Sequence, residues 1–246
     1  MARFLRNLYV LLLCVLLFAF KAAQCQLKSA SDRLPDTQVR TSVQSSDLLE
    51  RIAETTHQVS DLSSDVDFQI ELHNLGMRFN VTGNLYYKHP DHFRLQLHDI
   101  PEFLLHREND AFRTTNVLAG IRRDIKTQYN ARIINQTKYQ DENCYVIQLI
   151  PKQQENIARI LLWVDANHYT MPLVIIRYDD GSTLSQRKLY TKANDVYVVS
   201  KMDSNYDAPG IQAEIFATFS HYKINQGMSD SVFEKEPTQQ NFISTF

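Results

Sequence analysis

Apolar and polar residues alternate with a period of two over much of this chain, which is the pattern of β-strands with one buried face. The clearest case is the stretch Gly83–Asp99. Apolar side chains recur at every second position on each side of a corner formed by His89, Pro90 and Asp91. Pro90 has no N–H to donate and disfavours helix at His89, so the chain turns between two strands there. We predict strand, corner and strand, with one apolar face and one polar face.

The same alternation predicts a long antiparallel ribbon over residues 68–87, with a turn at Asn74-Leu75-Gly76. Residues 158–164 are apolar at nearly every position, so we expect that strand to be covered on both faces. Asp179-Asp180-Gly181 predicts a hairpin turn, because Asp and Gly tolerate positive φ. Residues 101–127 follow the pattern weakly and suggest one or two short strands, followed over residues 116–126 by a short helix or an irregular lid. The remaining predicted strands are 129–134, 144–150, 171–178, 184–190, 196–199 and 213–222.

A helical spacing of apolar residues precedes the strands. Asp47 is placed to cap a helix, with Glu50 three residues later as in a capping box. The residues expected to form its buried stripe are Leu48, Leu49, Ile52, Ala53 and Val59. The predicted fold class is mainly β with α: a single curved antiparallel sheet, a half-barrel of about ten strands, with an N-terminal helix against its concave face.

The N-terminus has the composition of a secretory signal. Arg3 and Arg6 precede an apolar run from Leu8 to Phe20, and small residues follow at Ala22 and Ala23. We expect a signal peptide over 1–25, and an uncleaved membrane anchor is the alternative. Residues 26–44 are polar without periodicity, so we expect a flexible leader or tether, followed by a domain over 45–237 and a C-terminal tail over 238–246.

The chain has three cysteines, at positions 14, 25 and 144. Cys14 would leave with the signal peptide. Cys25 is a candidate for lipidation, because a bacterial lipoprotein signal ends just before a cysteine. If Cys25 instead survives without a lipid, it could pair with Cys144 in an oxidising compartment. Cleavage after Cys25 would leave Cys144 alone.

Charge and composition exclude some classes of function. The formal net charge is −2, and no strongly basic excess is present to bind nucleic acid. The chain has only six glycines and no Gly-rich phosphate-binding motif. Asn80 and Asn135 begin glycosylation sequons, which would matter only in a eukaryotic secreted protein.

The sequence contains none of the common catalytic motifs, so we expect no enzymatic activity, no catalytic residues and no cofactor. The only cluster that resembles a metal site contains His89, His92 and His98 near Asp91 and Asp99. His92 and His98 share a face of the predicted strand but are too far apart to bind one ion, so we predict solvent-facing histidines and no metal. We expect Cys144 to be a small buried residue or a spare thiol, because no motif places a base beside it.

The corner also carries a resemblance to a known family. An aromatic pair, then Lys88-His89-Pro90-Asp91-His92-Phe93, then an alternating strand resembles the signature of the LolA-type lipoprotein carriers, whose superfamily includes the acceptor LolB. Leu161–Asp165 with the Tyr178–Gly181 hairpin resembles the second half of lipoprotein-sorting proteins. Ser229–Phe233 is similar to the terminal strand of that family. The resemblance covers about residues 47–237.

The resemblance implies a LolA-like half-barrel whose concave face binds acyl chains under a displaceable helical lid. The classical carriers have an Arg before the Pro of the corner, where it latches the lid, and His89 occupies that position here. The implied lid residues are Leu48, Leu49, Ile52 and Val59, and the implied ligand-cavity residues are Met77, Phe79, Val81, Leu85, Tyr87, Phe93, Leu95 and Leu97.

The implied function is that of an exported lipid or lipoprotein carrier or chaperone. Its implied partners are acyl chains of lipid or lipoprotein and sorting proteins of the inner or outer membrane. The implied location of the monomer is the periplasm or envelope, with an anchor if Cys25 is lipidated. Alternation alone fits a filled core equally well. An envelope interaction module and a secreted enzyme without short motifs therefore stay as alternatives.

Overall fold

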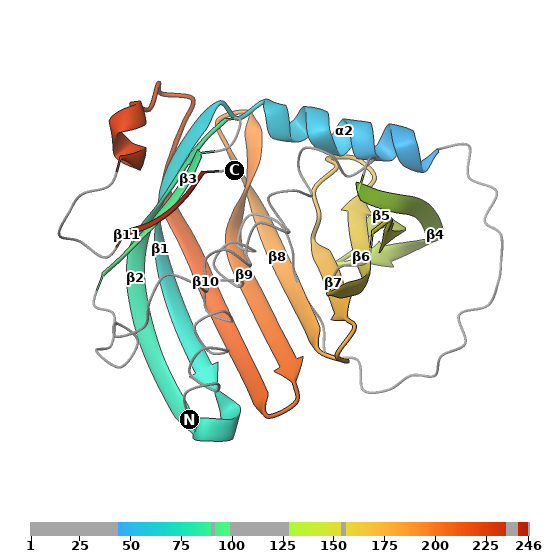
Figure 1. Cartoon of the computed structure of the whole chain (residues 1–246). Coiled ribbons are helices and arrows are strands. Elements are labelled where there is room, and N and C mark those ends of the chain that lie inside the picture. The colour runs from blue at the N-terminus through green and yellow to red at the C-terminus, as the bar shows by residue number, and fades with distance from the viewer. Residues whose placement is uncertain (1–43, 90–91, 99–127, 154–155, 235–240, 246) are drawn as a thin grey trace.

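The computed structural model describes residues 44–89, 92–98, 128–153, 156–234 and 241–245. Its main feature is one 11-stranded sheet in which every neighbouring pair is antiparallel (Figure 1). The strand order is β11-β3-β2-β1-β10-β9-β8-β7-β6-β5-β4. The strands are β1 (Asp61–Leu72), β2 (Met77–Lys88), β3 (His92–His98), β4 (Tyr129–Tyr139), β5 (Glu142–Pro151), β6 (Ile157–Asp165), β7 (Leu173–Tyr178), β8 (Thr183–Ala193), β9 (Val196–Ala208), β10 (Ile211–Ile224) and β11 (Asn241–Thr245).

The sheet consists of two meanders that meet at one pair of strands. β1, β2 and β3 follow one another in the sheet, as do β4 to β10, and β1 pairs with β10 to join the two meanders. β11 and β4 stand at the two ends of the order, so the sheet is open. The sheet curves so that its two wings lie on either side of one interior (Figure 1). One wing consists of β1, β2, β3 and β11, and the other consists of β4 to β7. The predicted fold class, a curved antiparallel sheet with one N-terminal helix, is confirmed.

The corner predicted at Pro90 lies between β2 and β3 as expected. Leu85 is opposite Leu95, and Tyr87 is opposite Phe93 in the ladder. Because directly opposed residues of an antiparallel pair point to the same face, these four side chains form one apolar surface. Pro90 and Asp91 themselves lie outside the described residues.

The N-terminal helix, α2, spans Ser45–His57. It begins two residues before the predicted cap, so Asp47 lies in its first turn and the capping prediction was wrong. There the carboxylate accepts a hydrogen bond from the Ser46 hydroxyl (2.9 Å), and its charge is favourable near the positive end of the helix dipole. Val59 lies in the connection to β1 and not on the helix, because the helix ends at His57.

The segment Ser229–Phe233, for which the resemblance implies a terminal strand, is not a strand. Residues Asp230–Phe233 form a 3₁₀ helix, η3, whose N-cap Ser229 accepts a hydrogen bond from the Ser231 N–H (3.3 Å). Side chains of the neighbouring strands hold η3: Lys88 Nζ donates to Asp230 Oδ1 (2.6 Å), and Arg94 donates to the carbonyl of Val232. The last strand of the sheet is β11, which pairs with β3. The expected C-terminal tail, 238–246, therefore includes a strand of the sheet.

The expectation that residues 158–164 are covered on both faces was also wrong. In β6 the side chains of Ile160, Leu162 and Val164 are buried, whereas Leu161 and Trp163 on the other face are only partly buried. The neighbouring β7 is the strand with two buried faces, over Leu173–Ile176. The short strands and short helix suggested for 101–127 lie outside the described residues.

We expect Gly83→Ala to lower the free energy of unfolding by about 2 kcal/mol. A Cβ on Gly83 would lie 2.5 Å from the backbone oxygen of Gln96 on β3, so the paired strands would have to move apart. Chemical denaturation of both proteins measures the change. Thr82→Ala, an exposed neighbour on the same strand, is the control and should shift stability by less than about 0.5 kcal/mol. Equal effects of the two substitutions would contradict the close approach.

Candidate functional site: the inner face of the sheet

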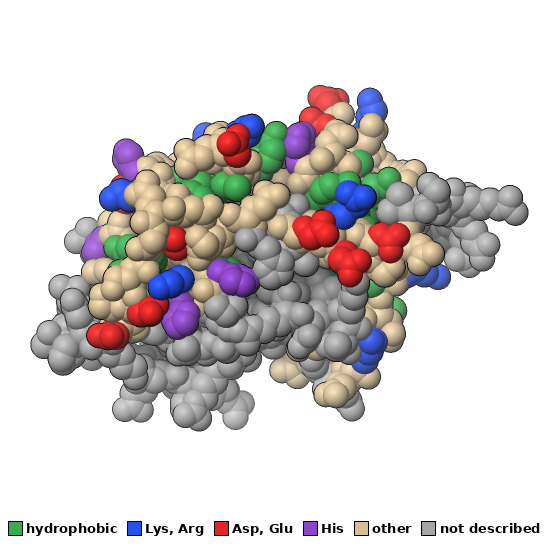
Figure 2. All heavy atoms as spheres, turned by 90° about the horizontal axis from the view of Figure 1, so that it is seen from above, with side chains coloured by type: hydrophobic (Ala, Val, Ile, Leu, Met, Phe, Trp, Pro, Cys, Tyr) green, Lys and Arg blue, Asp and Glu red, His purple; other side chains and the backbone are tan. Residues whose placement is uncertain are grey.

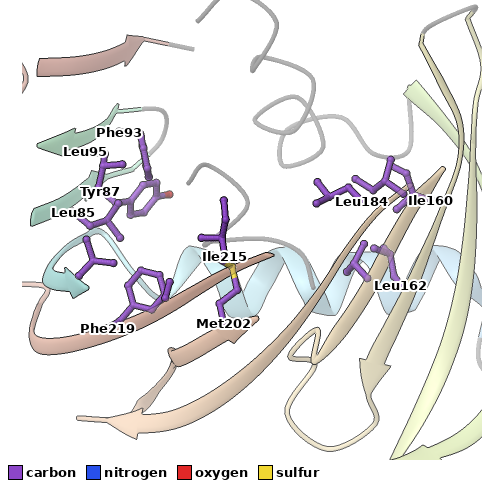
Figure 3. Packing of buried hydrophobic residues seen from close by; sticks show 14 of the residues in the cluster. Leu85, Tyr87, Phe93, Leu95, Ile160, Leu162, Leu184, Met202, Ile215 and Phe219 are labelled. Atoms are coloured by element: carbon purple, nitrogen blue, oxygen red, sulfur yellow. The ribbon is translucent and has the colours of Figure 1, made fainter. Parts of the chain in front are cut away.

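One face of the sheet, which we call the inner face, carries the main hydrophobic cluster. Both meanders and α2 contribute to this cluster. Leu85 and Leu95 belong to one wing, Ile160 and Leu162 belong to the other, and Ile215 lies between them (Figure 3). The alternation seen in the sequence produces this surface, because every second residue of each strand points to the same face. The hydrophobic cluster of the described residues thus covers the inner face from one wing to the other.

The predicted cavity residues all lie on this face. Six of them are buried to 7% exposure or less: Val81, Leu85, Tyr87, Phe93, Leu95 and Leu97. Met77 and Phe79 are only partly buried and pack against the edge of the cluster. They lie near the β1–β2 turn, at the end of the sheet opposite to α2 (Figure 1). The described structure thus brings the eight side chains together on one surface.

The predicted lid residues lie on the same cluster. Leu48, Leu49 and Ile52 are buried on one stripe of α2, and Val59 is partly buried against the cluster. The opposite stripe of α2 is exposed and charged, with Asp47, Glu50, Arg51 and Glu54. Figure 2 looks down on the rim along which α2 lies and shows acidic, basic and hydrophobic side chains interspersed there. The amphipathic pattern therefore orients the helix with its apolar stripe towards the inner face.

Polar contacts join the body of α2 to other parts of the domain. At its N-terminus the Ser45 hydroxyl donates to the carbonyl of Ala131 on β4 (3.1 Å). In its middle the Arg51 guanidinium stands over the ring of Tyr169, 5.5 Å from the centroid. Both contacts are partly exposed and are of modest strength.

A denser set of hydrogen bonds fixes the connection from α2 to β1. Asn225, which follows β10, donates to the carbonyl of Gln58 (2.9 Å) and accepts from the Ser60 N–H (2.7 Å). The buried carboxylate of Asp61 accepts from the N–H groups of Gln226 (2.9 Å) and Gly227 (3.0 Å). We call Asp61 and Asn225 the hinge pair, because they fasten the connection that follows the helix to the sheet.

His89, the predicted latch, is exposed and lies in the turn after β2. Its backbone N–H donates to the carbonyl of Ser60 (2.7 Å), so this residue contacts the same connection that the hinge pair fastens. This contact agrees with the expectation that His89 lies beside the lid. That its imidazole latches the lid stays a prediction.

The other histidines of the corner point away from the inner face. His92 is partly buried with its ring 5.3 Å from that of Phe233, and exposed His98 shares a hydrogen bond of 2.9 Å with Asn84. No group of three or more potential metal ligands occurs among the described residues. Asp91 and Asp99 lie outside them.

Cys144 lies on the face of β5 opposite to the inner face and is buried as a free thiol. Burial raises the pKa of this thiol to about 11, and the nearby carboxylates of Asp165 and Glu142 add to the shift. At neutral pH the group is therefore protonated, which disfavours a nucleophilic role. Cys25, the lipidation candidate, lies outside the described residues.

Sequence reasoning missed half of the inner face and its polar members. The missed half lies on strands β5 to β10, which supply buried residues such as Ile147, Val174 and Ile215. The alternation of apolar and polar residues in these strands was a signal that could have identified them. Sequence reasoning also missed Gln186, Lys188 and Ser204, which are buried on the same face. Their signal was a polar residue at the positions where the alternation of β8 and β9 calls for an apolar one.

Among the described residues, no helix has the length and apolar character needed to span a membrane. The expected signal peptide (1–25) and most of the expected leader (26–44) lie outside the described residues.

A family described as "Uncharacterized protein" matches residues 116–238, which is half of the chain. No curated protein matches the sequence. Among solved structures, a DUF1329 family protein from Desulfovibrio piger is similar with a TM-score of 0.60 and 14% identity over 76% of this chain and 95% of that one. A putative outer membrane lipoprotein-sorting protein domain from Vibrio parahaemolyticus has a TM-score of 0.59 and 12% identity over 76% and 96%.

A LolA superfamily protein from Nitrosomonas europaea has a TM-score of 0.57 and 13% identity over 79% of this chain and 99% of that one. At these identities the three structures show a shared fold. Together with the family match, they establish that the chain belongs to the family described as "Uncharacterized protein" and that it has the LolA-like fold.

Proposed function

We propose that this chain is an exported lipid- or lipoprotein-binding carrier or chaperone of the cell envelope, which holds acyl chains non-covalently against the inner face under α2. The observation that carries the proposal is the inner face itself: a mainly apolar surface, formed by both meanders of an open sheet and by the buried stripe of a single helix. The likeness of the fold to a lipoprotein-sorting domain and to a LolA superfamily protein supports it.

Hydrophobic transfer would supply most of the affinity. Each methylene that leaves water contributes about 0.8 kcal/mol, so a long acyl chain needs little specific chemistry to bind. The 13 residues of α2 give a helix about 20 Å long, whereas eleven strands at about 4.8 Å spacing extend about 48 Å. The helix therefore covers only part of the sheet, and its displacement would open the apolar surface beneath it.

The attachments of α2 suit such a displacement. Among the described residues, Leu48, Leu49 and Ile52 form the buried stripe, and the polar contacts of the helix include those of Ser45 and Arg51. The hinge pair and the backbone of His89 would keep the C-terminal end fastened while the N-terminal end swings away. In this mechanism His89 positions the connection through its backbone N–H and, as proposed from the resemblance, latches the lid through its side chain.

The proposal extends to the rest of the chain. Residues 1–25 would direct export as a signal peptide, and residues 26–44 would tether the domain if Cys25 carries a lipid. The domain, 45–237, would exchange acyl chains of lipid or lipoprotein with sorting proteins of the envelope as a monomer.

A second candidate is an interaction module of the envelope with a filled core. The burial of most inner-face residues below 10% exposure favours it, because a dry core has that property. The two candidates differ in whether the purified protein holds or takes up lipid.

We expect mature protein from its host envelope to show bound lipid by native mass spectrometry and to release it on organic extraction. The extracted protein should then bind a fluorescent acyl probe saturably, and unlabelled lipid should displace the probe. A protein that carries no lipid and ignores the probe would contradict the carrier and favour the interaction module.

Making the lid polar should change the exchange of ligand. In Leu48→Ser with Ile52→Ser, α2 loses most of its apolar contact, so we expect the probe to dissociate about tenfold faster or more. Stopped-flow fluorescence measures the rate. Glu54→Ser, on the exposed stripe of the same helix, is the matched control and should release the probe as the wild type does. Equal rates in the three proteins would exclude α2 as a lid.

A further inference from the structure

The wing of the sheet that contains β4 to β7 carries a second apolar surface on its outer face, which is the face opposite to the inner face (Figure 1). On β6 the side chains of Leu161 and Trp163 point to the outer face and are only partly buried. Trp163 is directly opposite Val146 on β5 and Leu173 on β7. Leu161 is directly opposite Ile175 on β7. These five side chains stand apart from the cluster of the inner face, and we call them the outer patch.

Three arginines lie beside the outer patch. Arg159 on β6 and Arg177 on β7 are directly opposite each other and have the same parity as the outer-patch residues of their strands. Arg132 on β4 is opposite Gln148, and Gln148 is opposite Leu161 in the next ladder. Because directly opposed residues of an antiparallel pair point to the same face, the three arginine side chains point to the outer face. Arg132 and Arg177 are exposed, and Arg159 is partly exposed.

The pairing of Arg159 with Arg177 is unfavourable unless an anion lies nearby, since like charges directly opposite each other destabilise a sheet. No ion pair between described residues involves either of them or Arg132. The carboxylates that follow Arg177 in the chain, Asp179-Asp180, belong to the β7–β8 turn, where Asp180 accepts a hydrogen bond from the Ser182 N–H (2.8 Å). An external anion would relieve the repulsion between the two guanidinium groups.

Acidic residues of this wing lie at the other end of its outer face. Glu142 is the first residue of β5, and Asp165 is the last residue of β6. Asp165 is opposite Cys144, which is about 14 Å along β5 from Gln148. The carboxylate of Asp165 is buried and accepts hydrogen bonds from the N–H groups that follow it in the chain. The arginine end of the outer face is therefore a positively charged surface beside an apolar one.

We propose that the outer patch and its three arginines dock the protein on an anionic phospholipid bilayer. A guanidinium group binds phosphate oxygens through two parallel N–H donors, and basic residues strengthen binding to a surface of anionic lipids. Tryptophan and leucine side chains bury favourably at the boundary between head groups and acyl chains. A bilayer presents phosphate and hydrocarbon in one surface, so it would contact the arginines and the outer patch together. This docking surface lies opposite to the inner face and does not depend on the proposed function of that face.

The spread of the arginines favours an extended surface over a single ion. They come from β4, β6 and β7, and β4 lies three strand spacings from β7, which is about 14 Å. One inorganic phosphate cannot reach across that distance, whereas a bilayer offers many phosphates. An acidic polypeptide also offers charges over such a distance, but it lacks the hydrocarbon that the outer patch would contact.

The test measures binding to vesicles. It uses the full-length mature chain with Cys25→Ser, so that no lipid anchor contributes. We expect this protein to bind vesicles of equal parts phosphatidylglycerol and phosphatidylcholine about tenfold or more tightly than vesicles of phosphatidylcholine alone, and salt should weaken the binding. The fluorescence of Trp163, the single tryptophan, should shift to shorter wavelength on binding, because its ring leaves water.

In Arg159→Gln with Arg177→Gln, the affinity for the anionic vesicles should fall about tenfold or more. The urea midpoint of this variant should be no lower than that of the wild type, because the like-charge pair is gone. Lys192→Gln with Lys223→Gln removes the same net charge from exposed positions on β8 and β10, and this matched control should bind the vesicles nearly as the wild type does. Leu161→Ser should weaken binding to a smaller extent than the arginine variant.

Equal binding of the wild type to the two kinds of vesicle, or equal losses in the arginine variant and the lysine control, would overturn the docking surface. A wild type that ignores both kinds of vesicle but binds soluble polyglutamate through Arg159 and Arg177 would overturn it as well and indicate an acidic protein partner. Binding of the acyl probe at the inner face is measured separately, so these results leave the proposed function standing.

Discussion

Replacing Ile215 by glutamate is expected to abolish binding of the acyl probe and to lower the free energy of unfolding by about 4 kcal/mol or more. Ile215 is 1% exposed and lies between the two wings of the inner face (Figure 3). A carboxylate at this position either remains charged in an apolar surrounding or takes up a proton at a cost in free energy. Urea denaturation followed by the fluorescence of Trp163, the single tryptophan, measures stability, and probe titration measures binding.

The neighbouring residue provides the control. Phe216 is 39% exposed on the opposite face of β10, so Phe216→Glu should leave probe binding unchanged and alter stability by about 0.5 kcal/mol or less. Ile215→Val, which removes one methylene, should retain binding and cost about 1 kcal/mol. It therefore separates loss of binding from loss of folding. An Ile215→Glu protein that folds and binds the probe as the wild type does would place the ligand elsewhere.

Asp61→Ala should lower the free energy of unfolding by about 3 kcal/mol. The carboxylate of Asp61 is buried and accepts hydrogen bonds from the N–H groups of Gln226 and Gly227, which follow β10. Removing it leaves both donors without this acceptor and loosens the connection between α2 and the sheet. Urea denaturation measures the loss, and limited proteolysis around Gln58 reports on the connection.

Asp61→Asn keeps one acceptor oxygen and should lose about half as much stability as Asp61→Ala. Asp67→Ala, which removes an exposed carboxylate from the same strand, should change stability by about 0.5 kcal/mol or less. If Asp61→Ala and Asp67→Ala have the same stability, the hinge pair does not fasten the helix.

Strong periodic patterns in the sequence predicted the elements that the structure confirms. The alternation around Pro90 places Leu85, Tyr87, Phe93 and Leu95 on one face, and the helical spacing of Leu48, Leu49 and Ile52 gives α2 its buried stripe. These predictions depend on local geometry, since a strand has a period of two and a helix a period of 3.6 wherever they pack.

Short or mixed segments were predicted less well. Ser229–Phe233 could form a strand or a turn by itself, and its 3₁₀ conformation is held by Lys88 and Arg94, about 140 residues away in the chain. The cap of α2 was misplaced for a similar reason: Ser45, at the true start, contacts the carbonyl of Ala131 on β4. No local pattern contains information about such distant partners.

The sequence by itself determined that this protein is built from amphipathic strands with one amphipathic helix before them, because each periodicity is a local property of the backbone. Only the tertiary structure decided which strands are neighbours, and hence that β1 pairs with β10 and joins the two meanders into one apolar inner face. It also placed Gln186, Lys188 and Ser204 together within that face. Strand pairing and burial depend on contacts between residues far apart in the chain, and the alternation of a single strand is the same for every partner that the strand could have.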